Sequence, residues 1–378
     1  MQTEDIRHWL RLSMTEGVGN ESARRLLGAL GSVQAIFEQP FHALTHIVSE
    51  AQAHALMSEP PDFEIQMART LQWLASSPEG HARALWSLDD PLYPTAFFQL
   101  SDPPLMLYAQ GQLSRRPTPA LSIVGSRNPT PQGVQIAQDF AQSLVEQGIC
   151  VVSGLALGID GAAHAGALTA TTSSLDQCKT VAIVGTGLDR VYPRQHHALA
   201  QDICAHGWMI SEFHLGQGPL THHFPRRNRL IAALGSGTLV VEAAQQSGSL
   251  ITADMAIELG RDVMAVPGSI YSTHSKGCHQ LIRQGAILVE TIQDILHELP
   301  QLIDPQTQTQ GATTMAPHNP AVDDPLLQHM GFGPFNVDEL QLRSGIDTAL
   351  LQTELLRLEL AGAVARMPGG GFQRISNA

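Results

Sequence analysis

The residues with the clearest capacity for chemistry are three arginines within four positions, in the segment FPRRNRLIA. Arg226, Arg227 and Arg229 fall at the start of an expected helix, and an aromatic residue precedes them. Residues three apart on a helix lie about one turn apart, so Arg226 and Arg229 can approach one anion from neighbouring faces. Guanidinium groups bind phosphate, and the ring of Phe224 can stack on an unpaired base. The segment therefore predicts contact with a single nucleic-acid strand.

The same arginines allow a plainer interpretation. One of them could pair with Glu212 or Glu242 while the others are solvated, as many surface charges are. We expect such an ordinary role for Arg227, but not for all three arginines.

A second candidate anion site is the segment VGSRNPT, which follows an apolar run and precedes an expected helix. The backbone amides of Gly125 and Ser126 and the guanidinium of Arg127 could surround one phosphate, with a hydroxyl from Ser126 or Thr130. A glycine after a first strand is common, and no G-x-G-x-x-G pattern is present at this turn. The segment is therefore informative only together with others.

A third candidate follows the apolar run GTLVV. Ser247, Gly248, Ser249 and Thr252 open an expected helix, and their amides and hydroxyls could hold a second phosphate. Several separate phosphate sites favour a polymer strand over a single nucleotide.

Asp160 and His164 lie four residues apart on one face of another expected helix. A catalytic Asp-His pair would have this spacing. However, an Asp near a helix N-terminus is usually a cap or a partner of the helix dipole, and a His in an Ala- and Gly-rich helix usually packs against a sheet. We favour a structural role for both and predict no catalytic residue.

The elements that would position these residues alternate between short apolar runs and longer helical stretches, which is typical of parallel βαβ units. Glycines close several of the runs, and Gly154 and Gly185 would leave a shallow open floor at the sheet rim. Expected strands cover 120–125, 149–154, 180–185, 208–212, 237–242, 262–268 and 286–290. Expected helices cover 131–147, 158–170, 194–206, 226–234, 250–260 and 275–284. We predict an α/β fold with a Rossmann-like, doubly wound, mostly parallel sheet, with ligands at the carboxyl ends of its strands.

The flanking segments have other patterns. The first 75 residues read as helical and contain a helix, a Gly-Val-Gly turn and a helix, which is a helix-hairpin-helix (SAM-like) pattern. We expect this hairpin to pack against protein rather than touch DNA, because the segment is acidic. The C-terminal segment reads as two helices and a Gly-rich wing, a winged-helix-like pattern whose acidic second helix favours protein contact. The expected domains are 1–80 (helical), 81–300 (Rossmann-like), 301–321 (flexible linker) and 322–378 (winged-helix-like).

Composition sets further limits. The 378 residues carry a net charge of −13, and acidic side chains outnumber basic ones in 1–76, 77–300 and 301–378 alike. Any anion site must therefore be local. No apolar run is long enough to span a membrane, and the four cysteines lack the C-x-x-C spacing of a metal site. We expect a cytoplasmic protein with no cofactor and no metal.

Six segments, taken in order, resemble the DprA/Smf (DNA-processing protein A) family. They are VGSRNPTPQG, VVSGLALGIDGAAHAGAL, TVAIVGTGLDRVYP, ISEFHLGQGPLTHHFPRRNRLIA, VVEAAQQSGSLITADMAIELGRDVMAVPG and GCHQLIRQGA. The resemblance implies a protein of natural transformation and competence that binds incoming single-stranded DNA, protects it and helps load the RecA recombinase. It also implies a homodimer through the Rossmann-like domain, with single-strand-binding protein as a further candidate partner.

Carried over residue by residue, the resemblance implies a DNA-binding pocket that coincides with the anion sites above. Its members are Gly125, Ser126, Arg127, Phe224, Arg226, Asn228, Arg229, Ser247, Gly248, Ser249 and Thr252. Gln245 and Gln246 precede this last group where some relatives have a basic residue, so the pocket would rely more on its arginines. On this hypothesis the protein is no enzyme, and Arg127→Ala and Arg229→Ala each lose single-strand affinity with little change in stability.

Two alternatives remain open. The segment GSGTLVVEA resembles part of the glycine-rich motif of lysine-decarboxylase-like phosphoribohydrolases, nucleotide-hydrolysing enzymes that pair an Arg with the Glu of that motif. Arg229 and Glu242 could form such a pair, although the first half of the motif is missing. A winged helix could also belong to a transcription factor, against which its acidic helix argues.

Overall fold

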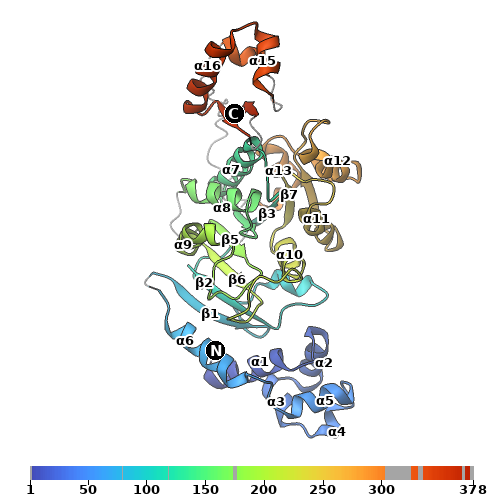
Figure 1. Ribbon diagram of the computed structural model, residues 1–378. Coiled ribbons are helices and arrows are strands. Elements are labelled where there is room, and N and C mark those ends of the chain that lie inside the picture. The colour runs from blue at the N-terminus through green and yellow to red at the C-terminus, as the bar shows by residue number, and fades with distance from the viewer. Residues whose placement is uncertain are drawn as a thin grey trace.

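The computed structural model describes residues 2–78, 80–117, 119–172, 177–302, 325–330, 335–367 and 371–374. The N-terminal helices lie at one end of an elongated molecule, the sheet occupies the middle, and the C-terminal helices lie at the other end (Figure 1).

A nine-stranded sheet forms the centre, in the order β1-β2-β6-β5-β4-β3-β7-β8-β9. Seven neighbouring strands are parallel to one another, namely β6, β5, β4, β3, β7, β8 and β9. Strand β2 pairs antiparallel with both β1 and β6. Their bounds are β1 Ala82–Ser87, β2 Met106–Gly111, β3 Ala120–Val124, β4 Cys150–Ser153, β5 Thr180–Ile183, β6 Trp208–Ser211, β7 Gly237–Val240, β8 Asp262–Ala265 and β9 Ile287–Leu288. The predicted doubly wound, mostly parallel α/β sheet is confirmed.

Helices cover both faces of this sheet because its central strands are apolar on both sides. The helices α7, α8 and α13 share one buried core with one face, and α10, α11 and α12 share another core with the opposite face. Their bounds are α7 Pro131–Glu146, α8 Ile159–Thr169, α9 His197–His206, α10 His223–Leu234, α11 Gly248–Glu258, α12 Lys276–Arg283 and α13 Ile292–Glu298, with short 3₁₀ helices at Thr95–Gln99, Arg194–His196, Thr273–Ser275 and Pro300–Leu302. The seven expected strands and six expected helices all form, with small shifts at their ends.

The antiparallel strands β1 and β2 were not predicted from the sequence. They extend the sheet beyond β6, and Trp86 of β1 meets Trp208 of β6 with 5.2 Å between ring centroids. This extension matters because the N-terminal helices pack on it: Trp73 contacts Tyr108 of β2 edge to face, and the hydroxyls of Thr70 and Tyr108 are 3.2 Å apart.

The N-terminal region is helical as predicted, with α1 Thr3–Met14, α2 Asn20–Leu30, α3 Val33–Glu38, α4 Phe41–Leu44, α5 Glu50–Met57 and α6 Phe63–Ala75. The hairpin between α1 and α2 makes protein contacts. The side chain of Gln52 donates a hydrogen bond at 2.7 Å to the carbonyl of Gly17, which lies in the turn of this hairpin. Arg24 of α2 donates one to the Ser101 carbonyl at 2.7 Å.

The C-terminal region forms the predicted winged helix, with α14 Pro325–His329, α15 Val337–Ser344, α16 Thr348–Leu360 and a wing of β10 Val364–Arg366 paired with β11 Phe372–Arg374. The Gln373 side chain donates to that of Gln132 on α7 at 2.9 Å. The linker expected at 301–321 lies outside the described residues apart from its first two positions.

Asp160 and His164 are both buried in α8, as the structural interpretation predicts. The Nδ1 atom of His164 lies 2.7 Å from the hydroxyl of Thr180, which donates to the Val151 carbonyl. Nδ1 is therefore the donor, and burial lowers the pKa of His164 to about 3. A neutral, buried imidazole bonded to strand β5 holds α8 in place.

Candidate nucleic-acid interface

A pocket of about 140 Å³ lies at the carboxyl ends of β4 and β5, beside the turn that follows β3. It is lined by Arg127, Gly154, Ala156, Leu157, Gly185, Thr186, Tyr192, Pro193, Phe224 and Arg227. The strand ends thus bring residues from four separate segments together, as a parallel sheet does.

Three side chains give this pocket its chemistry. The guanidinium of Arg127 is exposed and lies 5.3 Å from the ring centroid of Phe224. The ring of Tyr192 stands 5.9 Å from that of Phe224, tilted by 44°. Two partly exposed rings and one guanidinium can hold a base by stacking and its phosphate by charge-assisted hydrogen bonds.

Arg227 is the deepest of the three clustered arginines, with 3% of its surface exposed. Its Nη1 donates to the carbonyl of Gly154 at the end of β4, and to that of Ile183 at the end of β5 at 2.5 Å. A Cβ at Gly154 would clash with this guanidinium, so only glycine permits the approach. The expectation that Arg227 is solvated or paired with Glu212 or Glu242 is wrong, because its face of α10 points at the sheet.

Arg226 and Arg229 do lie one turn apart, but both contact Glu212. The Nη2 of Arg229 is 2.5 Å and the Nε of Arg226 is 3.2 Å from Oε2 of that carboxylate. Arg229 also reaches Asp102 at 3.3 Å and is buried, whereas half of the Arg226 side chain is exposed. Burial raises the pKa of Glu212, and the two arginines oppose that shift. Arg226 is thus the member of this pair that a ligand can reach.

The crevice between β3 and β7, where the strand order reverses, is closed. Glu242 accepts hydrogen bonds from the Thr130 amide at 2.9 Å and from the Thr130 hydroxyl at 2.6 Å. The pairing of Arg229 with Glu242, which the phosphoribohydrolase alternative requires, is not formed. The pocket described above lies on the β4 and β5 side of the turn at Gly125 and Ser126.

The third candidate segment opens α11. Ser247 caps that helix through its hydroxyl, and Gly248 is exposed, whereas Ser249 and Thr252 are buried. Asn228 connects the two helices by donating to the Gly248 carbonyl at 3.5 Å while accepting from Nε of Arg227 at 3.0 Å. A neighbouring cavity of about 320 Å³ has no Lys or Arg among its described lining residues.

Sequence reasoning missed Tyr192 and Thr186. Both lie in the loop between β5 and α9, and Tyr192 is the aromatic residue of the segment VGTGLDRVYP that was noted only for its glycines. An aromatic side chain in a loop that follows a strand end was the available signal.

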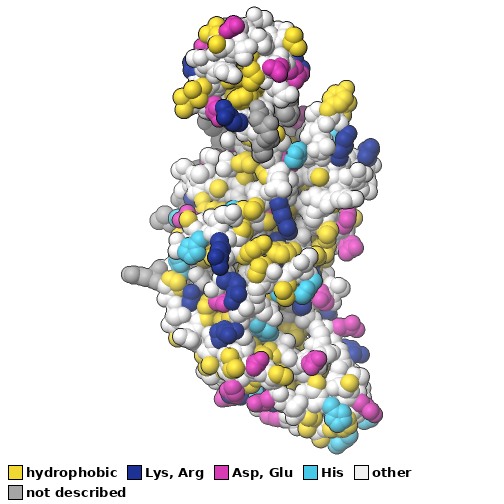
Figure 2. All heavy atoms as spheres, viewed as in Figure 1, with side chains coloured by type: hydrophobic (Ala, Val, Ile, Leu, Met, Phe, Trp, Pro, Cys, Tyr) yellow, Lys and Arg dark blue, Asp and Glu magenta, His cyan; other side chains and the backbone are white. Residues whose placement is uncertain are grey.

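The charge distribution agrees with a local anion site on an acidic protein. Figure 2 shows Lys and Arg side chains gathered over the middle of the molecule, whereas Asp and Glu are more frequent over the N-terminal helices. Within the described ranges, no cluster of His, Cys, Asp or Glu could hold a metal ion. None of the described helices is long and apolar enough to cross a membrane.

Fold and site together define a Rossmann-like α/β protein with an arginine and aromatic pocket at its strand ends and a C-terminal winged helix. The sequence model of the family described as DNA recombination-mediator protein A matches residues 84–300, and that of the DprA winged helix domain matches 310–370. The chain belongs to this DprA/Smf family, whose members have a role in DNA processing and recombination.

Individual relatives support this family assignment. The chain is 39% identical to Protein Smf of Escherichia coli K12 over 80% of this chain and 79% of the relative. The crystal structure of DNA processing protein A from Streptococcus pneumoniae matches with a TM-score of 0.64 and 34% identity, covering 79% of this chain and 98% of that one. A structure of the Helicobacter pylori protein, which concerns the single-stranded DNA binding mode of that protein, matches with a TM-score of 0.51 and 30% identity over 58% of this chain and 97% of that one.

The contacts of Arg229 change the expectation for its removal. Arg229→Ala leaves the buried Glu212 with one partner fewer, and breaking a buried ion pair costs roughly 3 kcal/mol. We expect a clearly lower urea midpoint for Arg229→Ala, and a shift equivalent to less than about 0.5 kcal/mol for the exposed Arg127→Ala. Equal midpoints for the two variants would show that the Glu212 cluster does not stabilise the fold.

Proposed function

We propose that the protein binds single-stranded DNA at the pocket of Arg127, Tyr192 and Phe224. The observation that carries the proposal is an exposed guanidinium within 5.3 Å of an aromatic ring that has a second ring beside it. Every base has a flat face, so stacking on these rings needs no particular sequence. The bases of a duplex are already stacked on each other, which favours an unpaired strand.

The eleven positions predicted from the sequence take two roles in this proposal. Exposed or partly exposed members would touch the strand: Gly125, Ser126, Arg127, Phe224, Arg226, Asn228, Ser247 and Gly248. Buried members would hold the others in place: Arg229, Ser249 and Thr252.

The finer biological role is also a proposal. Membership of a family of recombination mediators supports a protein that protects incoming single-stranded DNA in natural transformation and helps load RecA, with single-strand-binding protein as a further partner. The four cysteines are free and buried, and the Cys150 thiol donates a hydrogen bond to the Cys178 sulfur at 3.9 Å. That fits a reducing compartment and hence the cytoplasm.

We further propose that the protein acts by binding rather than as an enzyme. The described lining of the pocket contains no Asp, Glu, His or Cys, the side chains most often used for acid, base or nucleophilic chemistry. Release of free base from AMP by the purified protein would contradict this.

Binding is tested by fluorescence anisotropy with labelled oligo-dT and a matched duplex. Arg127→Ala should weaken single-strand binding by roughly tenfold or more, since a hydrogen bond to a charged group contributes about 1.5–3 kcal/mol. The log–log salt slope should fall by about 0.7 for each phosphate that the variant no longer neutralises. Arg116→Ala is the matched control, because Arg116 is exposed and precedes β3 at the opposite end of the strands.

Identical affinities for wild type, Arg127→Ala and Arg116→Ala would exclude the pocket as the site of DNA binding. The same variants test the mediator role: Arg127→Ala should lose RecA assembly on a strand coated with single-strand-binding protein, and Arg116→Ala should keep it.

A homodimer through the Rossmann-like domain would place two pockets on one strand and raise affinity without new contacts. The edge strand β9 supports this proposal, because Leu288 is 46% exposed on an unpaired edge, and the nearby loop exposes Ile270 and Tyr271. We expect Leu288→Glu to shift the mass measured by light scattering from dimer to monomer. The exposed Leu350→Glu of the winged helix should leave the mass unchanged. A monomeric wild type would refute the proposal.

A further inference from the structure

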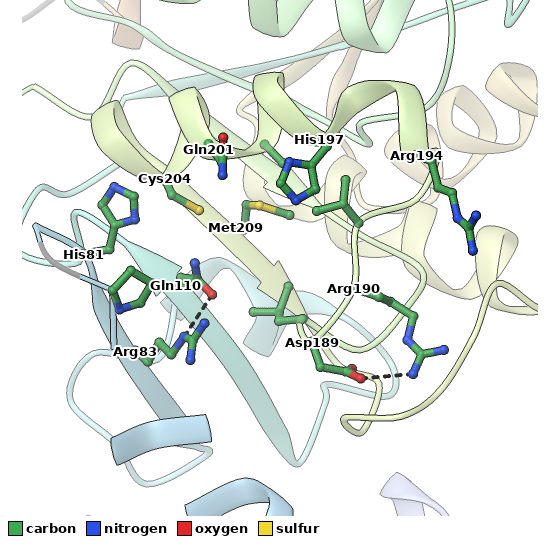
Figure 3. A pocket seen from close by; sticks show the side chains of 14 residues that line it. His81, Arg83, Gln110, Asp189, Arg190, Arg194, His197, Gln201, Cys204 and Met209 are labelled. Atoms are coloured by element: carbon green, nitrogen blue, oxygen red, sulfur yellow. Dashed lines mark hydrogen bonds and ion pairs between the residues drawn. The ribbon is translucent and has the colours of Figure 1, made fainter. Parts of the chain in front are cut away.

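A second and larger cavity, of about 750 Å³, lies outside the pocket described above. It opens between the antiparallel strands β1 and β2, helix α9 and the loop that joins β5 to α9 (Figure 3). Its volume falls within the roughly 300–1,000 Å³ typical of small-molecule sites. Neither the sequence motifs nor the proposed function accounts for it.

Among the described residues that line this cavity, arginines outnumber carboxylates. Arg194 is exposed and has no partner among the described residues. Arg83 donates to neutral oxygens of Gln110, Trp73 and Ser76, and its second terminal nitrogen is left without a described partner. The carboxylate that lines the cavity, Asp189, pairs with Arg190 at 3.0 Å. The guanidinium of Arg194, and one terminal nitrogen of Arg83 on the other side of the cavity, therefore remain for anions.

The floor of the cavity is apolar, while polar groups stand at its wall. Cys204 and Met209 are buried at the floor. Burial raises the pKa of Cys204 to about 12, so this thiol acts as an apolar group. His197 and Gln201 of α9 project at the wall in Figure 3 and are exposed. The apolar floor and the amide and imidazole groups at the wall are suited to a base. The guanidinium groups are suited to phosphate.

One loop connects this cavity with the first pocket. Tyr192 lines the pocket, and Arg194 lines the cavity two residues further on. Their Cα atoms can be at most about 7 Å apart. A strand stacked on Tyr192 and Phe224 therefore needs little length to bring its next phosphates to Arg194.

We propose that the cavity is a second nucleotide site on the path of the same single strand, with a base on the Cys204 and Met209 floor and a phosphate at Arg194, while Arg83 on the opposite wall is available to a neighbouring phosphate. The proposal rests on the proposed function. It assigns a task to β1 and β2, which carry Arg83 and Gln110 and complete the wall opposite α9.

The test compares a labelled thymidine dinucleotide, which is too short to occupy both sites, with an oligothymidylate of about 16 nucleotides, by anisotropy on the full-length protein. Arg194→Ala should weaken the long oligonucleotide by roughly fivefold to tenfold and lower its salt slope by about 0.7, while leaving the short one unchanged. Arg116→Ala controls for removal of one exposed charge, and thermal midpoints check that each variant is folded.

The other outcomes overturn the proposal in distinguishable ways. If Arg194→Ala binds the long oligonucleotide like Arg116→Ala, the cavity is not on the strand's path. If it weakens the short oligonucleotide equally, the two sites are not separate. If wild type binds neither length but binds thymidine monophosphate in an Arg194-dependent manner, the cavity takes a free nucleotide, and the proposed single-strand function fails with it.

Discussion

A buried guanidinium holds the strand ends in the arrangement on which the site depends. From α10, Arg227 donates to the carbonyl of Gly154, directly after β4, and to that of Ile183 at the end of β5, which fixes the helix against the two strand ends. Burial lowers the pKa of Arg227 to about 10, so it keeps its charge at neutral pH. Phe224 lies one turn earlier on the same helix, and this places its ring over Gly185 and in front of Arg127.

A second constraint decides where a ligand can lie. Doubly wound sheets usually bind ligands in the crevice where the strand order reverses, and here Thr130 and Glu242 fill that crevice with hydrogen bonds. The accessible pocket, of about 140 Å³, lies on the β4 and β5 side.

Sequence reasoning predicted the parallel core because its strands are continuous apolar runs, each followed by a helical pattern. It did not find β1 and β2, whose antiparallel pairing depends on distant partners such as β6. It placed the three arginines on the correct helix, but it did not predict which of them are buried and which are exposed. The burial of each arginine depends on which face of α10 packs against the sheet, and that orientation depends on residues that are distant in the sequence. Tyr192 could have been found from its position after a strand end, whereas the cavity near Arg194 joins segments more than 100 residues apart.

The most direct measurement is ultraviolet cross-linking of single-stranded oligo-dT to the wild-type protein, followed by mass spectrometry of the linked peptides. Cross-links are expected at Phe224 and Tyr192, whose ring centroids lie 5.9 Å apart at the strand ends. Cross-links confined to the winged helix or to the hairpin of α1 and α2 would contradict binding at this pocket.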